Sequence, residues 1–343
     1  MRLRRSILLP VVCLAAIHLL VLAAGFVAPY DYSQQYRDAI LSPPTRVHWI
    51  DQTGAFHLRP FIYQRSERTP GSSEYEEDVT VAYPLHFFTP DSAADMAGRP
   101  AGHRHLFGVD PPGHFFILGT DDLGRDVFSR LLYGGQMSLL SGLFAATLSL
   151  ALATLFGSMA GFYGSWVDAV VMRLAELFLA LPWLYLLLAL RAMLPLHIDP
   201  VHIFFIVIAL IGTLGWARPA RLIRGMALSL CERHYVVAAR SFGASDAYLI
   251  RRHILPGMSS VLLTQAALLI PQYVLAEVTL SFFGLGIGEP VPSWGSMLGS
   301  LQQYRVLISA WWMFSPGVLM TVVFFSYRAL HDALRTDLSI VEL

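Results

Sequence analysis

Long apolar stretches alternate with short polar ones along most of this chain. A helix needs about 20 mainly apolar residues to cross the hydrocarbon core of a bilayer. Six stretches satisfy this length, and the pattern therefore predicts an all-α polytopic membrane protein with six spans. They lie at residues 7–29, 137–162, 169–191, 199–218, 259–284 and 306–327. An even number of spans places both chain ends on the same side.

The distribution of arginine predicts which side holds the two ends. Arginine in short loops stays on the cytoplasmic side because it resists translocation. With both ends inside, 13 arginines fall in inner segments and only two in the short outer loops. Arg125 and Arg130 also fall outside, close to several aspartates. We therefore expect residues 1–6 and 329–343 to be cytoplasmic.

The first apolar stretch, 7–29, is expected to remain as a span, because its core is long and no small-residue cleavage site is evident. Residues 30–118 differ in composition, with 11 acidic residues, 7 arginines and six of the 12 histidines. Short alternating pieces such as 79–83 favour strands, so we expect a small external β or irregular domain. Residues 119–135 open with Thr120 followed by acids, which is typical of a helix start, and predict an amphipathic helix on the outer surface.

Composition supports a membrane location and excludes several kinds of chemistry. The chain is 55% hydrophobic and 14% charged, against about 25% charged in soluble domains, and its formal net charge is zero, which argues against a nucleic-acid partner. All 24 basic residues are arginine. The absence of lysine excludes a P-loop lysine, a Schiff base and a Ser-Lys dyad. Cys13 and Cys231 belong to segments at different depths, so we expect neither a disulfide nor a cysteine metal site.

A basic island interrupts the apolar pattern at residues 218–257. It contains seven arginines and only two acidic residues, for a formal charge of +5. Two pairs of small residues, 238–239 and 243–244, allow another protein to approach the backbone closely. We expect a helix at 235–241, a turn at Gly243, a second helix capped by Ser245 and a stop at Pro256.

Four sequence blocks in one register resemble a known family. The island, with Ala-Ala at 238–239, Gly243 and a closing Leu-Pro, resembles the EAA loop of ATP-binding-cassette (ABC) importer permeases, although Val237 replaces its glutamate. The segments 119–130, 277–286 and 292–298 resemble the C-type subunit of the dipeptide, oligopeptide and nickel branch. The likeness covers residues 119–337, nearly two thirds of the chain.

The resemblance implies the type I ABC importer permease fold, with a permease domain at residues 136–328. It also implies that the 218–257 loop docks on an ATPase subunit and transmits its motion. The residues expected to carry this coupling are Tyr235, Ala238, Ala239, Arg240, Gly243, Ala244, Ser245, Leu255 and Pro256. Without the resemblance, a solvated basic loop that only sets topology remains open.

The same resemblance implies the partners and the place of the protein. They are a homologous permease, two ABC ATPases that bind the ATP, an external solute-binding protein and the lipid of a bacterial inner membrane. The chain itself is then a transport subunit with no enzyme activity and no cofactor. The expected cargo is a di- or oligopeptide, with nickel or another small solute as the alternative. An ATPase-independent transporter or channel is a third hypothesis, which the scarcity of charges at mid-membrane depth disfavours.

Other residues are candidates for the path or for gating. Glu277 lies within the fifth predicted span, where a charge usually signals function, although a helix–helix hydrogen bond is an alternative role. The further candidates are helix breakers and an aromatic residue: Pro271, Gly284, Gly286 and Trp294. We also expect Trp183, Trp294, Trp311 and Trp312 to be interfacial anchors. His103, His105 and His114 are expected to be scattered surface histidines and not a metal site.

Overall fold

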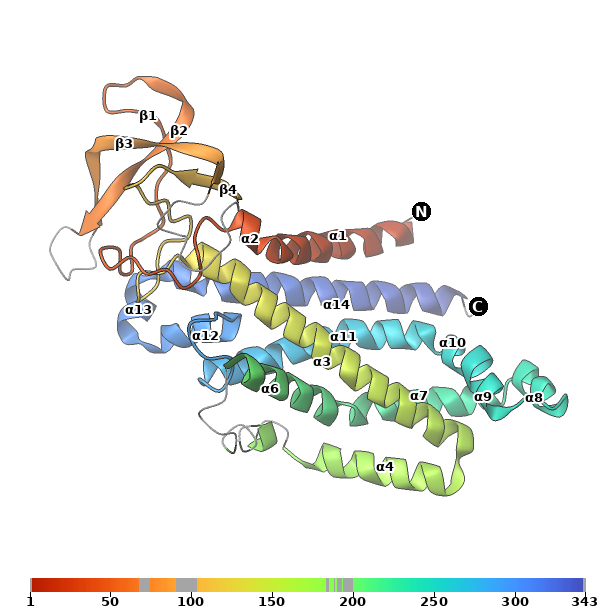
Figure 1. The fold of residues 1–343 in the computed structure, drawn as a ribbon. Helices are drawn as coiled ribbons and strands as arrows, with labels where there is room; N and C mark the ends of the chain where they lie inside the picture. The colour runs from red at the N-terminus through yellow and green to blue at the C-terminus, as the bar shows by residue number, and fades with distance from the viewer. Residues whose placement is uncertain are drawn as a thin grey trace. The chain divides into compact units, whose positions relative to one another are not determined.

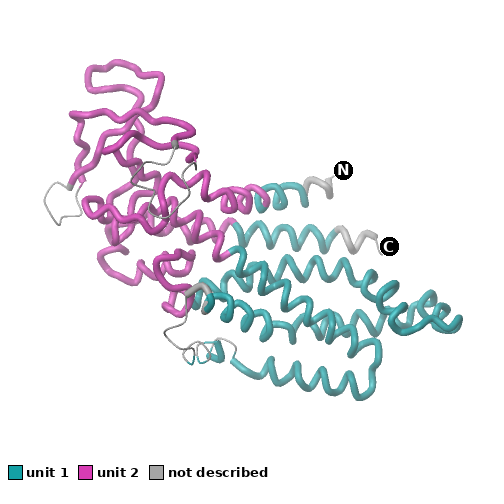
Figure 2. The backbone as a smooth tube through the Cα atoms, in the orientation of Figure 1, with its two compact units in different colours: residues 1–14, 139–280, 323–343 teal, residues 15–138, 281–322 magenta. Residues whose placement is uncertain are grey.

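The computed structural model describes residues 2–67, 75–90, 104–182, 185–187, 189, 193 and 200–341 (Figure 1). The chain divides into two compact units, shown in different colours in Figure 2. We call residues 1–14, 139–280 and 323–343 the helical unit, and residues 15–138 and 281–322 the sheet unit.

Three apolar helices in the described chain are long enough to cross a membrane. They are α3 (Val127–Tyr163), α11 (Ser259–Phe282) and the stretch Trp311–Thr336, which includes most of α14 (Ser315–Val341). A fourth candidate is the pair α6 (Pro200–Gly215) and α7 (Ala217–Cys231), which bends by 40° at Trp216. The apolar part of α1 (Arg2–Leu22) is shorter, at Ile7–Leu22.

Several of the predicted spans have different bounds in the structure. The second begins earlier, at Val127, and the fourth continues to Cys231. Helix α4 (Ser165–Ala180) ends before Pro182, and most of the remaining predicted span to residue 191 lies outside the described residues. The last long helix begins at Ser315 and not at residue 306. It follows α13 (Tyr304–Ser309) and a 3₁₀ turn, η3 (Trp311–Phe314). Pro316 suits this start, because a first-turn position has no helical acceptor for its missing N–H.

Helix α3 packs closely on its neighbours within the helical unit. A Cβ placed on Gly142 would lie 2.2 Å from Val274 of α11, and one on Gly157 would lie 2.6 Å from the Ala220 carbonyl of α7. Small residues let apolar helices approach in this way when water cannot drive their association. Buried side chains of α7, among them Ile223 and Ala227, complete this core.

The sheet unit contains a four-stranded antiparallel sheet in the order β1-β2-β3-β4. Its strands are β1 (His48–Ile50), β2 (Phe56–Glu67), β3 (Tyr75–Pro90) and β4 (Arg104–Val109). Ile62, Leu85 and Phe115 form its buried cluster. The short helix α2 (Ala24–Val27) packs with Leu132 near the start of α3.

Residues 119–126 form a turn, so the helix predicted at 119–135 is wrong for its first part and is present only from Val127 onward. The backbone N–H of Asp121 donates to the Arg125 carbonyl (2.9 Å), and α3 begins only at Val127. The Asp121 carboxylate accepts the backbone N–H groups of Leu123 and Arg125, both at 2.9 Å. Such side-chain bonds compete with a helix, and the charges that suggested a wet surface are buried.

Candidate functional site

The basic island begins later than predicted, because its first arginines belong to helix α7. The positions 220, 223, 227 and 230 recur at helical spacing and are buried, so α7 continues well past residue 218. Arg224 forms a bidentate ion pair with Asp168 of α4. We therefore define the coupling segment as residues 232–257. It lies at one end of the helical unit (Figure 1).

Two short helices joined by a tight turn make up most of the coupling segment. Helix α8 spans His234–Ser241 and α9 spans Asp246–Leu249. Gly243 has a φ of 84°, the left-handed conformation in which a side chain would be strained. The Ser245 hydroxyl accepts the backbone N–H of Tyr248 at 3.4 Å. The predicted first helix, glycine turn and serine cap are therefore confirmed.

Pro256 does not end the second helix, in contrast to the prediction. The backbone widens into a π-helical turn, η1 (Ile250–Ile254), and continues through α10 (Leu255–Gly257) toward α11. A π-turn absorbs a local mismatch in the hydrogen-bond ladder, and the proline lies in the first turn of α10, where its missing N–H is tolerated. The coupling segment is thus joined to α11 by nearly continuous helix.

Buried side chains hold the coupling segment against the helical unit. Val236, Leu249 and Ile254 are buried in the same core as α7. The Arg240 guanidinium lies 5.1 Å from the centre of the Phe162 ring, which ties the end of α8 to the end of α3. His253 contacts the rings of Tyr235 and Tyr248, each 5.7 Å away between centroids. The segment is therefore a folded projection.

The outer face of the coupling segment is apolar at its centre and basic around it. Phe242 is 92% exposed, and Tyr235 and Ala238 are also exposed. Ala239 and Ala244 are half-buried behind them. Four arginines of the segment are exposed: Arg233, Arg240, Arg251 and Arg252. An exposed aromatic side chain surrounded by cationic groups is suited to bind an apolar groove with an acidic edge on another protein.

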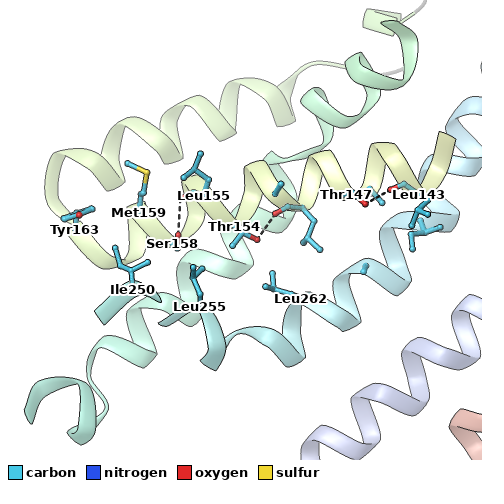
Figure 3. A pocket seen from close by; sticks show the side chains of 15 residues that line it. Leu143, Thr147, Thr154, Leu155, Ser158, Met159, Tyr163, Ile250, Leu255 and Leu262 are labelled. Carbon is cyan, nitrogen blue, oxygen red and sulfur yellow. Dashed lines mark hydrogen bonds between the residues drawn. The ribbon is translucent and has the colours of Figure 1, made fainter. Parts of the chain in front are cut away.

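A groove of about 660 Å³ runs along α3, η1 and α11 in the helical unit (Figure 3). The hydroxyls of Thr147 and Thr154 donate to the Leu143 and Leu150 carbonyls of their own helix, at 2.8 and 2.7 Å. The hydroxyls are thereby satisfied, and the groove wall is mainly apolar. Leu255, a predicted coupling residue, also lines this groove.

The predicted path residues lie in different environments. Glu277 is only 2% exposed in α11, and Pro271 is accommodated within the same helix. Gly284 has a φ of 74° in the loop after α11, and Gly286 packs against Ser281. The structure does not bring these residues together into one described cavity.

Trp294 is not placed as expected for an interfacial anchor. Its side chain is fully buried, its indole N–H donates to the Leu131 carbonyl (3.0 Å), and its backbone N–H donates to the Ser138 hydroxyl (3.1 Å). It opens α12 (Trp294–Gly299), whose start is capped by Ser293. Trp312 is also buried, Trp311 is exposed, and Trp183 lies outside the described residues.

A buried charge cluster in the sheet unit was missed by the sequence reasoning. Arg125 donates to Asp121 (2.8 Å) and, through its two terminal nitrogens, to Glu289 (2.6 and 3.3 Å). Arg130 reaches the same Glu289 at 3.2 Å. The two arginines and two carboxylates balance in charge, which offsets the cost of burying Arg125, Arg130 and Asp121. Arg125 and Glu289 are 164 positions apart in the sequence, so no local sequence pattern could predict this cluster.

Asp126, beside this cluster, is fully buried. Burial raises the pKa of Asp126 to about 7, the nearby Asp121 charge also raises it, and the hydrogen bonds from Ser129 act in the opposite direction. The Ser129 hydroxyl donates to one carboxyl oxygen (2.6 Å), whereas the other oxygen has no partner in the described chain. Near neutral pH this carboxyl is therefore poised between its neutral and charged forms.

The histidines expected at the surface are not all exposed, because His105 is buried and His114 is half-buried. His105 contacts the Ala28 carbonyl at 2.5 Å, and His114 lies among the rings of Tyr30, Tyr36 and Phe116. Residue 103 is outside the described residues. No cluster of three or more His, Cys, Asp or Glu suited to a metal occurs among the residues that are described.

Comparison with known proteins shows what the chain is similar to. Residues 153–340 match the family described as binding-protein-dependent transport system inner membrane component. The chain is 34% identical over 229 residues to a dipeptide transport system permease of Bacillus subtilis, covering 66% of this chain and 69% of that one. It is 34% identical over 301 residues to a glutathione transport system permease of Pectobacterium atrosepticum, covering 85% and 97%.

Two more similarities were found. An oligopeptide transport system permease of Bacillus subtilis is 35% identical over 232 residues, with 66% of this chain and 72% of that one covered. Among solved structures, an inward-facing MetNI methionine ABC transporter matches with a TM-score of 0.43 and 18% identity, covering 61% of this chain and 95% of that chain.

Proposed function

Because this chain belongs to the family of binding-protein-dependent transport system inner membrane components, we propose that it is a permease subunit of an ATP-driven peptide importer. Relatives that are 34–35% identical are named as dipeptide, oligopeptide and glutathione permeases. Di- and oligopeptides are therefore the cargo that we assign to it.

The observation that carries this proposal is the coupling segment at residues 232–257. Its apolar centre around Phe242 is exposed, while Val236, Leu249 and Ile254 anchor it to the helices. A partner protein that binds this projection can transmit force through it to the helices. The partner that we propose is an ABC ATPase, which binds and hydrolyses the ATP that this lysine-free chain has no P-loop to hold.

The proposed arrangement in the membrane has six spans with both ends in the cytoplasm. It requires α1, α4 and the bent pair α6–α7 to complete spans besides α3, α11 and α14. The coupling segment then faces the cytoplasm and residues 30–118 face outward in a bacterial inner membrane. A homologous permease, two ATPases and an external solute-binding protein complete the proposed complex. Glu277, Pro271, Gly284 and Gly286 remain proposed path or gating residues.

The test of this function uses the assembled complex in proteoliposomes. We expect ATP-dependent peptide uptake to be abolished by Gly243→Asp and by Ala239→Glu. Gly243→Asp places a charge on the docking face and strains a φ of 84°, and Ala239→Glu places a charge directly behind that face. ATPase co-purification should be lost as well.

Gly54→Asp is the matched control. Gly54 also has a φ of 84° and open space where a Cβ would lie, but it belongs to the sheet unit. This variant should retain ATPase binding and uptake. If uptake persisted in both coupling variants, or continued without any ATPase, the proposed mechanism would be wrong.

A further inference from the structure

Arg218 occupies an unusual place, in the first turn of α7 directly after the bend at Trp216. The contacts of neighbouring residues show where Arg218 lies along the candidate spans. Gly157 of α3 lies against Ala220, and Gly215 lies against the Tyr273 hydroxyl near the middle of α11. Arg218 is therefore well inside the candidate spans, and not in a cytoplasmic loop as its sequence neighbourhood predicted.

A cavity of about 200 Å³ within the helical unit is lined in part by Arg218. Phe178 and Leu181 contribute one apolar wall, and Gln272 and Tyr273 of α11 contribute polar groups. The Tyr273 hydroxyl is held 2.8 Å from the Ser149 hydroxyl. The cavity thus combines one cation, an amide and a fixed phenol with an otherwise apolar lining.

No carboxylate pairs with Arg218 anywhere in the described part of the chain. Two other arginines of the helical unit do have such partners: Arg224 pairs with Asp168 and Arg173 with Glu176. A charged side chain at membrane depth is expensive unless it meets a partner or lines a hydrated cavity. Arg218 is exposed, so its charge is available to a ligand that enters the cavity.

We propose that this cavity is a carboxylate-binding subsite that receives the C-terminal carboxylate of a peptide as it passes through the permease. The planar guanidinium matches a carboxylate with two parallel hydrogen bonds. The Gln272 amide adds a donor, and the apolar wall accepts a small C-terminal side chain. This inference rests on the proposed peptide import and adds the group of the peptide that the permease recognises.

The test compares Arg218→Gln with wild type in the assembled transporter, reconstituted with its binding protein and ATPases. The probes are a tripeptide library with free carboxyl ends and the same library amidated at the C-terminus, with import measured by mass spectrometry. We expect Arg218→Gln to lower import of the free acids about tenfold, the effect typical of losing one charge-assisted contact. Import of the amides should change less than about twofold, because the same reasoning leaves them without that contact.

Two further measurements separate a subsite from a structural role. ATPase activity stimulated by the peptide-loaded binding protein should be preserved in Arg218→Gln, because coupling lies elsewhere. Arg221→Gln is the matched control, since it removes the same charge one turn along α7 and does not line the cavity. It should leave the ratio of free-acid to amide import unchanged.

Three results would count against the inference. Unchanged import of free acids by Arg218→Gln would overturn it. An equal loss of acids and amides, or a joint loss of import and ATPase stimulation, would also overturn it, and would assign Arg218 to a lipid phosphate or a carboxylate of the partner permease. If wild type imported no peptide at all, the proposed function itself would fail and the subsite with it.

Discussion

Charged residues in this protein are placed according to what can neutralise them. Arg125 and Arg130 are buried, and both are held by Glu289, whose side chain is 55% exposed. Exposed pairs such as Arg328 with Asp332 contribute little by comparison, because water and salt screen them. Asp126 has no cationic partner of its own in the described chain, and it responds by holding its proton.

The raised pKa of Asp126 predicts how stability depends on pH. The folded state binds this proton up to about pH 7, whereas an unfolded aspartate loses it near its ordinary pKa of 3.8. Stability from this group is therefore complete below pH 3.8 and declines as the pH rises toward 7. Above about pH 7 the stabilisation that has been lost no longer changes with pH.

Asp126→Asn tests this dependence. The amide keeps an oxygen to accept the Ser129 hydroxyl but has no proton to lose. We expect the melting temperature of the variant to fall less than that of wild type between pH 5 and pH 8. The difference between the two proteins isolates this group from other titrating residues. Melting temperatures that fall equally in both proteins between pH 5 and pH 8 would contradict the assigned pKa.

Within the elements, local turn chemistry and long-range packing contribute separately. The Gly243 turn and the Ser245 cap depend on neighbouring residues, so the sequence alone predicted them correctly. The end of α7 was misjudged because its arginines conceal a buried stripe that includes Ile223 and Ala227. The π-turn at Ile250–Ile254 depends on how Leu249 and Ile254 pack, which no local pattern records.

Phe242 provides a test at the level of the coupling segment. It is 92% exposed and has no role in the core, and burying such a ring in a partner contributes about 1.5–3 kcal/mol. Phe242→Ser should weaken ATPase binding by about tenfold or more, by the same relation. The affinity of the detergent-solubilised permease for its ATPase measures this. Phe87→Ser, at an exposed phenylalanine of β3, is the control and should bind normally.

For the whole molecule, hydropathy located long apolar helices such as α3 and α11 but not their ends. Composition alone indicated a membrane protein, and the family match supports this. The turn at residues 119–126 could not be predicted, because its charges are neutralised by Glu289 far along the chain. The position of Arg218 within α7 was equally hard to predict, since arginines next to a span are ordinarily interpreted as cytoplasmic.

The proposed six-span topology makes a prediction for the intact membrane. In a background with Cys13 and Cys231 replaced by alanine, a cysteine at Gly54 should react with an impermeant maleimide from outside. Gly54 and Ser245 are both exposed. A cysteine at Ser245 should react only after the membrane is opened, because the proposed topology places it on the opposite side from Gly54. Labelling of the two sites from the same side would refute this topology.

Helix α3 has a mechanical consequence beyond its packing. Its 37 residues, at about 1.5 Å each, make a rod of about 55 Å. The contact between Arg240 and Phe162 attaches the coupling segment to one end of this rod. A tilt of about 5° at that end would displace the opposite end by about 5 Å, given this length. α3 would then act as a lever arm that converts a small pull from a partner into a movement the size of an amino-acid side chain.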